Sequence, residues 1–132
     1  KSAKPESMQL ASGLSAFGQA ALEAKAFAMA EPLLRESLAI RAEAKPDAWQ
    51  TFHVQSLLGA ALLGEGKPDD AAPLLVRAYE GLKQRESTLP ATSSRRLPEA
   101  LDRLIELHTA LKQPDEVKRW QALRAAYPKE PK

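Results

Sequence analysis

The stretch LLGAALLGEGKPDDAAPLL, residues 57–75, contains the pattern that decides the fold of this chain. It begins with apolar and small residues, and Gly64 and Gly66 are placed to end a first helix. The letters GKP then close a turn, and DDAAPLL opens a second helix with Asp69 as its expected N-cap. Pro73 would be the fourth helical residue, where a missing N–H leaves no helical hydrogen bond unmade. The stretch therefore predicts two helices joined by a short turn.

The same pattern is present three times in the chain. It occurs 41 residues earlier as KAFAMAEPLL, from Lys25, and 46 residues later as KQPDEVKRWQ, from Lys112. Small residues recur where two helices must approach closely, and large apolar residues fill the space beside them. The equivalent positions are Phe17, Leu58 and Leu104; Gly18, Gly59 and Ile105; Ala30, Ala71 and Val117; Leu34, Leu75 and Gln121; and Ser37, Ala78 and Arg124. Because one helix pair cannot bury both of its faces, the copies are expected to stack.

Six helices in three pairs follow from this register and from the positions of proline and glycine. The expected helices cover residues 8–24, 27–44, 47–63, 70–86, 97–111 and 115–127, with Asp47 as the N-cap of the third and a loop at 87–94. No segment shows the period of two that a half-buried strand requires. The prediction is a single all-α domain at 8–127, with repeats 8–46, 47–95 and 96–127, a linker at 1–7 and a frayed tail at 128–132.

Composition agrees with a helical domain and excludes several functions. Of the 132 residues, 44% are hydrophobic and only 5% are aromatic, which favours closely packed helices over a β-sandwich. There is no cysteine, so disulfides and thiolate metal sites are excluded. The body, residues 8–127, holds 15 basic and 15 acidic residues, so the net charge of +2 comes from the tails. Nucleic-acid binding is not expected, because the chain shows no basic face. A membrane span is not expected either, because no apolar run is long enough.

The apolar and small positions resemble the tetratricopeptide repeat (TPR). Leu58-Gly59, Leu62, Ala71, Leu75 and Ala78 match the spacings of that family, and Phe17-Gly18, Ala30, Leu34 and Ser37 match nearly as well. Periods of 41 and 46 residues are similar to the long repeats of the kinesin-light-chain type. The third copy departs from the pattern at Ile105, Gln121 and Arg124, as a terminal repeat with one solvated face would. The resemblance implies an α-solenoid in which antiparallel helix pairs form a right-handed superhelix.

Residues that could carry chemistry are few, and each has a structural interpretation. His53 and His108, the only histidines, are interpreted as surface or groove residues, because no further metal ligands stand at suitable spacing. Asp69-Asp70 and Asp115-Glu116 stand at helix starts, where carboxylates favour the helix dipole. Arg95-Arg96 is interpreted as solvated surface. We expect no catalytic residue, no cofactor and no metal, and therefore no enzyme activity in this chain.

The resemblance places a peptide-binding groove along the first helix of each pair. The groove residues it implies are Ser15, Gln19, Glu23, His53, Ser56, Ala60, Leu63, Asp102, Arg103, Glu106 and Thr109. TPR proteins that bind chaperone C-termini use several basic residues there, whereas only Arg103 is basic here. A protein or peptide partner with some positive charge is therefore expected, with no nucleic acid and no membrane insertion. Self-association through exposed end repeats is a further expectation.

An alternative function places the chain inside a larger signalling protein. The phrases EPLLRESLAIRAEAKPDAWQT and LLGAALLGEGKPDDAAPLL are similar to TPR regions at the C-terminal ends of bacterial serine/threonine protein kinases. The chain begins with Lys1 rather than Met and would then be part of a longer cytoplasmic protein, as a regulatory or oligomerising segment. No kinase motif occurs in it, so any catalytic domain would lie upstream.

Overall fold

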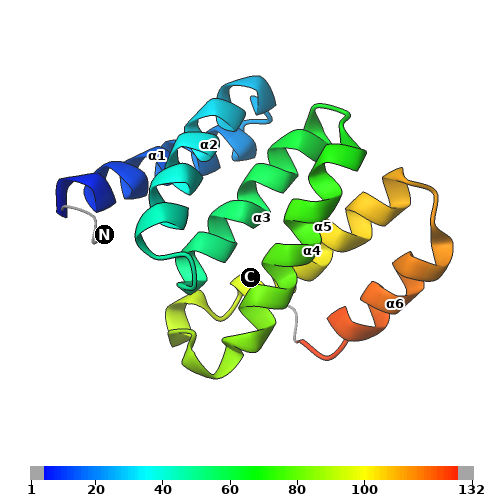
Figure 1. Cartoon of the computed structure of the whole chain (residues 1–132). Coiled ribbons are helices and arrows are strands. Elements are labelled where there is room, and N and C mark those ends of the chain that lie inside the picture. The colour runs from blue at the N-terminus through cyan, green and yellow to red at the C-terminus, as the bar shows by residue number, and fades with distance from the viewer. Residues whose placement is uncertain (1–4, 128–132) are drawn as a thin grey trace.

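Figure 1 shows a computed structural model of the chain, which describes residues 5–127. Its α-helices are α1 (Pro5–Glu23), α2 (Phe27–Ala44), α3 (Trp49–Gly64), α4 (Pro68–Gln84), α5 (Arg96–Ala110) and α6 (Pro114–Arg124). Two short 3-10 helices, Glu86–Thr88 and Ala91–Ser93, lie between α4 and α5. The described residues contain no β-strand. The predicted all-α fold of six helices is confirmed.

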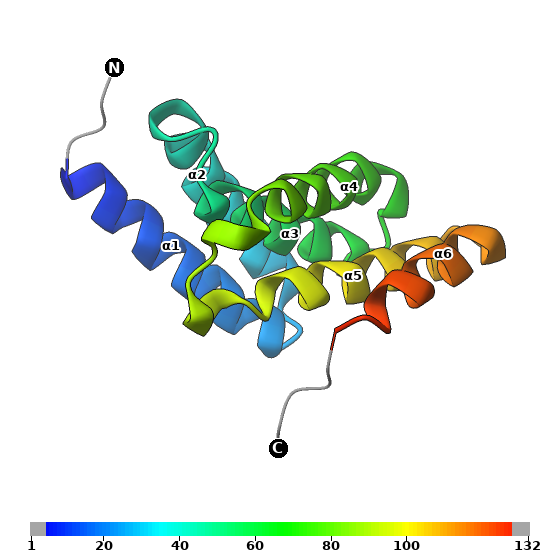
Figure 2. The ribbon, with the colours of Figure 1, turned by 90° about the horizontal axis from the view of Figure 1, so that it is seen from below.

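The helices stack in chain order, as a repeat solenoid requires. The most extensive contacts join helices that are neighbours in the chain, and in the first two pairs the contact within a pair is larger than the contact with the next pair. The first helices also touch one another, α1 against α3 and α3 against α5. Figure 2 shows α2 and α4 on the upper side of the ribbon and α1 and α5 on the lower side. The second helices of the first two pairs therefore lie on one side of the stack, whereas α6 lies lower, beside α5. The predicted groove follows the contacts that the first helices make with one another.

The turn inside each pair has the same backbone conformation in all three copies. Lys25, Gly66 and Lys112 have positive φ angles of 60°, 78° and 58°, and these residues are separated by 41 and 46 positions. In each copy the next amide donates to the carbonyl five residues earlier: Ala26 to Ala21 at 2.8 Å, Lys67 to Leu62 at 2.9 Å, and Gln113 to His108 at 2.9 Å. This is the Schellman arrangement that ends a helix. The register predicted from the sequence is therefore confirmed by backbone geometry.

The first two pairs close around a glycine. A Cβ atom at Gly18 would lie 2.6 Å from Leu34 Cδ2, and one at Gly59 would lie 2.6 Å from Leu75 Cδ2. Both leucines are buried, so neither can move aside without disturbing the core. Glycine at these positions lets the two helices of a pair approach with a leucine between them. The equivalent contact in both pairs explains why Gly-x15-Leu recurs in the sequence.

The third pair packs around a tryptophan instead. Ile105 is half-buried and Gln121 is exposed, so the glycine–leucine contact has no counterpart there. Trp120 of α6 is buried, and its ring meets that of Tyr79 of α4 edge to face, with centroids 5.4 Å apart and planes at 72°. Its indole Nε1 donates to Nδ1 of His108 at 3.0 Å. One large side chain thus fills the space between α4, α5 and α6.

The prolines of the second helices do not lie where the sequence placed them. The N-cap of α4 is Lys67 and its first residue is Pro68, so the prediction of Asp69 as N-cap was wrong. Pro73 is therefore the sixth helical residue, inside the helix, where it removes one helical hydrogen bond. Pro32 is likewise the sixth residue of α2. The Schellman turn sets these boundaries, because the residue after its left-handed position is already the cap.

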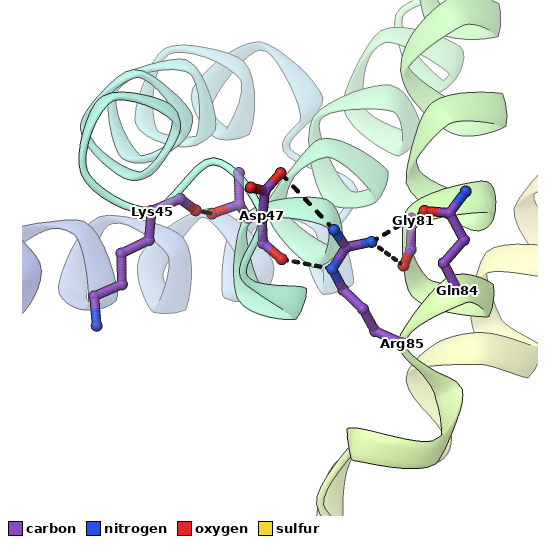
Figure 3. A network of polar contacts seen from close by, with 6 residues as sticks. Lys45, Asp47, Gly81, Gln84 and Arg85 are labelled. Carbon is purple, nitrogen blue, oxygen red and sulfur yellow. Dashed lines mark hydrogen bonds and ion pairs between the residues drawn. The ribbon is translucent and has the colours of Figure 1, made fainter.

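Asp47 is not the N-cap of α3, and it contributes to a different contact (Figure 3). The cap is Ala48, and no side-chain hydrogen bond is made there. The carbonyl of Asp47 accepts from Nε of Arg85, and its carboxylate lies 3.8 Å from Nη2 of the same residue. Arg85 also donates to the carbonyl of Gly81 at 3.0 Å and stacks on the ring of Phe52, 4.6 Å from its centroid. One arginine therefore joins the α2–α3 linker to the end of α4.

The remaining boundaries differ from prediction by a few residues. Helix α1 begins at Pro5, so part of the expected linker at 1–7 is helical. Helix α4 ends at Gln84, and the expected loop at 87–94 contains the two 3-10 turns. Helix α6 ends at Arg124 rather than at 127. The expected tail at 128–132 lies outside the described residues.

Candidate functional site

A pocket of about 280 Å³ lies between the three first helices, in the predicted groove. Helices α1, α3 and α5 all contribute to its wall, and Phe27 from α2 completes it. Five of the eleven predicted groove residues line it: Gln19, Glu23, Ala60, Arg103 and Glu106. The repeat register thus brings together residues that stand up to 87 positions apart in the sequence. Whether a ligand binds there stays a prediction.

The wall of this pocket combines apolar surface with carboxylates. Leu22 and Leu57 lie beside Ala60 and supply apolar surface. Glu23 and Glu106 bring carboxylates from α1 and α5, and both side chains are exposed. Among the ion pairs of the described residues, none involves either of these two glutamates. The pocket can therefore accept a chain with an apolar stem and a cationic end.

Arg103 also lines the pocket, but its guanidinium group is already engaged. Its Nη1 donates to Oγ of Ser56 at 2.9 Å, and Ser56 is fully buried in α3. Burial lowers the pKa of Arg103, and the charge of nearby Glu99 opposes this effect. Glu99, a further lining residue, forms an ion pair with Arg96 at 3.1 Å. Two predicted groove residues, Ser56 and Arg103, thus hold α5 against α3.

Four other predicted groove residues do not line this pocket. The hydroxyl of Ser15 donates to the Ser12 carbonyl at 3.1 Å, and the hydroxyl of Thr109 donates to the Ile105 carbonyl at 2.7 Å. The carboxylate of Asp102 accepts from Nε of Arg124 at 2.9 Å. Leu63 packs against the hydrophobic core. These side chains are occupied within the fold, so the groove is narrower than the register implied.

His53, the remaining predicted groove residue, lies among four arginines at the opposite end of α3. Burial, followed by the positive charges of Arg96, Arg103, Arg41 and Arg95, lowers the pKa of His53 to about 3. The ring is therefore neutral at physiological pH. Its Nδ1 is buried and has no hydrogen-bond partner among the described residues. The groove thus has a basic end at His53 and an acidic end at the pocket.

The basic end could not be found from the groove register alone. Arg41 stands at the end of α2, outside the first helices, yet it is only 8% exposed and its Nη2 donates to Oγ of Ser12 at 3.1 Å. The Arg96 side chain is 17% exposed, so its interpretation as solvated surface was wrong. The Nε atoms of Arg41 and Arg96 are buried without a hydrogen-bond partner among the described residues. Arg103 is therefore not alone on this side of the molecule.

His108 is a core residue rather than a surface or groove residue. It is 8% exposed, and it accepts a hydrogen bond from the buried indole of Trp120. The same Nδ1 lies 2.9 Å from the carbonyl of Leu104, so this ring nitrogen faces both a donor and an acceptor inside the core. His108 also lines a second pocket of about 410 Å³ between α5 and α6, together with Thr109, Lys112, Gln113, Pro114, Val117, Lys118 and Gln121. Of the eleven predicted groove residues, Thr109 lines this second pocket.

Metal-ligating side chains do not cluster in the part of the chain that the structure describes. No group of three or more His, Cys, Asp or Glu side chains within residues 5–127 could hold a metal ion. The acidic pair Asp69 and Asp70 lies exposed in the first turn of α4, and Asp115 lies exposed in the first turn of α6. These carboxylates sit at the positive ends of helix dipoles, as the sequence indicated.

The chain was compared with protein-family models and with curated proteins. No protein-family model matches it, and no curated protein matches it either. Among the described helices, none is both long and apolar enough to cross a lipid bilayer. The functional argument therefore depends on the groove itself.

Proposed function

We propose that this chain is a non-catalytic interaction module of the tetratricopeptide type, which binds an extended peptide in the groove formed by its first helices. The single observation that carries the proposal is the pocket between α1, α3 and α5, where residues from three separate repeats meet. Concave sites of this kind with an apolar wall and a few charged groups are typical of ligand binding. Affinity would come from dispersed contacts along the groove rather than from one reactive group.

The charges of the groove indicate the polarity of the peptide. A lysine or arginine side chain would place its methylene stem on Leu22, Leu57 and Ala60 and its charge near Glu23 and Glu106. The basic end, with Arg41 and Arg96, would favour an acidic group elsewhere on the same ligand. The proposed ligand therefore carries positive charge at the pocket and negative charge toward His53.

A charge-scanned peptide array tests this proposal. Peptides with a basic residue are expected to bind, and peptides bearing only acidic residues are expected not to. The double variant Glu23→Gln/Glu106→Gln should weaken binding by about two- to thirtyfold, because exposed charge pairs contribute roughly 0.2–1 kcal/mol each. Glu80→Gln, an exposed glutamate of α4 that does not line the pocket, is the matched control. An array in which only acidic-tailed peptides bind would overturn the proposal.

A second candidate function is a regulatory or oligomerising segment of a cytoplasmic bacterial serine/threonine protein kinase. It is supported by the similarity of residues 31–51 and 57–75 to C-terminal regions of such kinases. In that protein the groove would recruit a substrate or a regulator to a catalytic domain located upstream. The sequence of the full gene decides between the two functions. A kinase domain with its own catalytic motifs is expected under the second one only.

A further inference from the structure

The basic end of the groove carries more positive charge than the fold neutralises. Four guanidinium groups act on the ring of His53, and their residues come from the end of α2 and from α5 with its N-cap: Arg41, Arg95, Arg96 and Arg103. Among the ion pairs of the described residues, only the pair of Arg96 with Glu99, at 3.1 Å, involves a member of this group. The other three charges have no carboxylate partner there. Because charge that is withdrawn from water normally has a counter-charge, this end of the groove is suited to an anion.

Arg41 shows this imbalance most clearly, because it is only 8% exposed. It donates from Nη2 to the neutral hydroxyl of Ser12 on α1, at 3.1 Å, and its charge acts on His53 of α3. The side chain therefore lies between two of the helices that form the groove. Its Nε is buried without an acceptor among the described residues, and so is Nε of Arg96. Since buried donors are nearly always paired, both atoms indicate an acceptor that these residues do not supply.

The guanidinium groups of this cluster are held in position by neighbours within the fold. Arg103 donates from Nη1 to Oγ of Ser56 at 2.9 Å, and Arg96 donates from Nη1 to the carboxylate of Glu99 at 3.1 Å. A guanidinium group has several N–H donors in one plane, and a single described side-chain contact leaves most of them unused. The unused donors come from α2 and α5, which both contact α3. Binding an anion here therefore requires little further ordering of side chains.

We propose that the basic end binds a phosphate group carried by the peptide ligand, as in a phosphorylated serine or threonine. This inference rests on the proposed function, which supplies the peptide. A phosphate monoester carries a charge of about −1.5 to −2 at neutral pH and has three acceptor oxygens, so it can meet several guanidinium groups at once. A carboxylate has a single charge and fewer oxygens, and it would leave part of the cluster unpaired.

The geometry of α3 sets the spacing between the two charges of the ligand. Ala60 lines the acidic pocket and stands seven positions after His53 on the same helix. At about 1.5 Å per residue, the two ends are roughly 10 Å apart along the helix axis. An extended peptide covers this distance in about three residues, at roughly 3.3 Å per residue. We therefore expect the phosphorylated residue about three positions from the lysine or arginine that enters the pocket.

Fluorescence anisotropy with labelled peptides tests the proposal. The arginine peptides that bind in the array are compared in serine, phosphoserine and glutamate forms, with the serine placed about two to six residues from the arginine. Phosphoserine at about three residues should raise the affinity at least about tenfold over serine, and glutamate should raise it less. Inorganic phosphate at constant ionic strength should displace the phosphopeptide only at much higher concentration, because it lacks the contacts of the peptide, and it should not displace the serine form.

Arginine variants test whether this cluster is responsible for the gain in affinity. Arg41→Gln removes the most buried charge and should abolish most of the gain from phosphorylation. Arg95→Gln changes an exposed residue, so it should leave the fold intact and reduce the same gain by up to about fivefold. Arg77→Gln, at an exposed arginine of α4, is the matched control and should leave the gain unchanged. Circular dichroism verifies that each variant folds.

The outcomes separate this inference from the proposed function. Equal binding of the serine and phosphoserine forms overturns the inference and leaves the proposed function standing. So does a gain that both cluster variants leave intact, or one that glutamate reproduces in full. Tighter binding of a short oligonucleotide than of any phosphopeptide overturns it in favour of a nucleic acid. If no peptide binds in any form, the proposed function fails, and thermal unfolding in inorganic phosphate then decides about the site alone. Stabilisation that Arg41→Gln removes retains an anion site without a peptide, and no stabilisation overturns the site as well.

Discussion

The first two helix pairs and the third achieve the same backbone arrangement with different side chains. In the first two, a glycine of the first helix lies against a buried leucine of the second, Gly18 against Leu34 and Gly59 against Leu75. In the third pair those positions hold a half-buried isoleucine and an exposed glutamine. Trp120 fills the interior there and contacts Tyr79 and His108. The comparison shows that the turn geometry, rather than one packing motif, defines the repeat.

Truncation of Trp120 should have the largest effect, because one side chain carries the packing of the third pair. Trp120→Ala is expected to lower the free energy of unfolding by about 3–5 kcal/mol, the usual range for a buried tryptophan. Urea denaturation measures this change. Trp120→Phe keeps a ring beside Tyr79 but loses the indole donor, so most of the loss should be avoided. Trp49→Ala, at a partly exposed tryptophan of α3, is the control and should cost less. An equal loss in both alanine variants would contradict the comparison.

Substitution of Gly59 tests the middle pair. Gly59→Ala places a Cβ 2.6 Å from Cγ and Cδ2 of the buried Leu75, so it should destabilise the fold by about 1–3 kcal/mol through overpacking. The same substitution at Gly13 meets nothing within 4 Å and should instead stabilise α1 by about 0.5–1 kcal/mol, because alanine favours helix. Thermal unfolding at low protein concentration compares the two. A gain in stability from Gly59→Ala would show that glycine is not required for close approach.

The stability of the fold should depend on pH through His53. His53 has no hydrogen-bond partner for its Nδ1, and its pKa in the folded chain is about 3, whereas the unfolded value is near 6.5. Between these values the unfolded chain binds the additional proton, so this residue makes the fold less stable as the pH falls below about 6.5. The loss should be steepest at about 1.4 kcal/mol per pH unit and should end near pH 3.

His53→Gln removes this titration and is the direct test. Urea unfolding measured between pH 4 and 7 should show a weaker dependence on pH in the variant than in the unmodified chain. Carboxylates elsewhere contribute to the acid slope of both proteins equally, so the difference between the two curves isolates His53. Curves that remain parallel over this range would show that the ring is protonated in the folded state, or that it is not buried.

The sequence predicted the helices and their register because both depend on local and periodic signals. Gly64 and Gly66 were expected to end α3, and the positive φ falls on Gly66. Lys25 and Lys112 adopt the same conformation at the equivalent positions of the other two copies. Such positions are not apparent from residue type, since lysine usually avoids positive φ. The repeat period supplied the information that composition could not. The helix boundaries were predicted less accurately. Asp47 and Asp69 were expected to be N-caps, whereas α3 begins at Trp49 and α4 begins at Pro68.

The candidate site was predictable only in part, because side chains reach across elements that the register treats separately. Gln19 and Glu106 both line the pocket, since they stand on first helices at equivalent positions of the repeat. Arg41 was missed because it stands on a second helix and reaches Ser12 of α1 across 29 positions. His108 was taken for a surface or groove residue because of its polar ring, although the register aligns it with Leu62 and Ala21, which are both buried. Its contact with Trp120 has no counterpart in the other two copies. A sequence pattern finds what is repeated, and these contacts are not repeated.

The turn inside each pair has a consequence for how such a chain can change in length. The connections at 24–26, 65–67 and 111–113 are equally short, whereas the connections between pairs, at 45–48 and 85–95, differ by several residues. We therefore expect insertions to be tolerated in the connections between helix pairs and not in the turn within a pair. Residues 26–66 form one whole unit, which begins directly after the turn residue Lys25 and ends at the equivalent turn residue Gly66. A duplication of this unit would therefore recreate both the turn within a pair and the interface between pairs. A chain of this kind can gain or lose whole helix-pair units, and each remaining helix still packs against a neighbour of the right type.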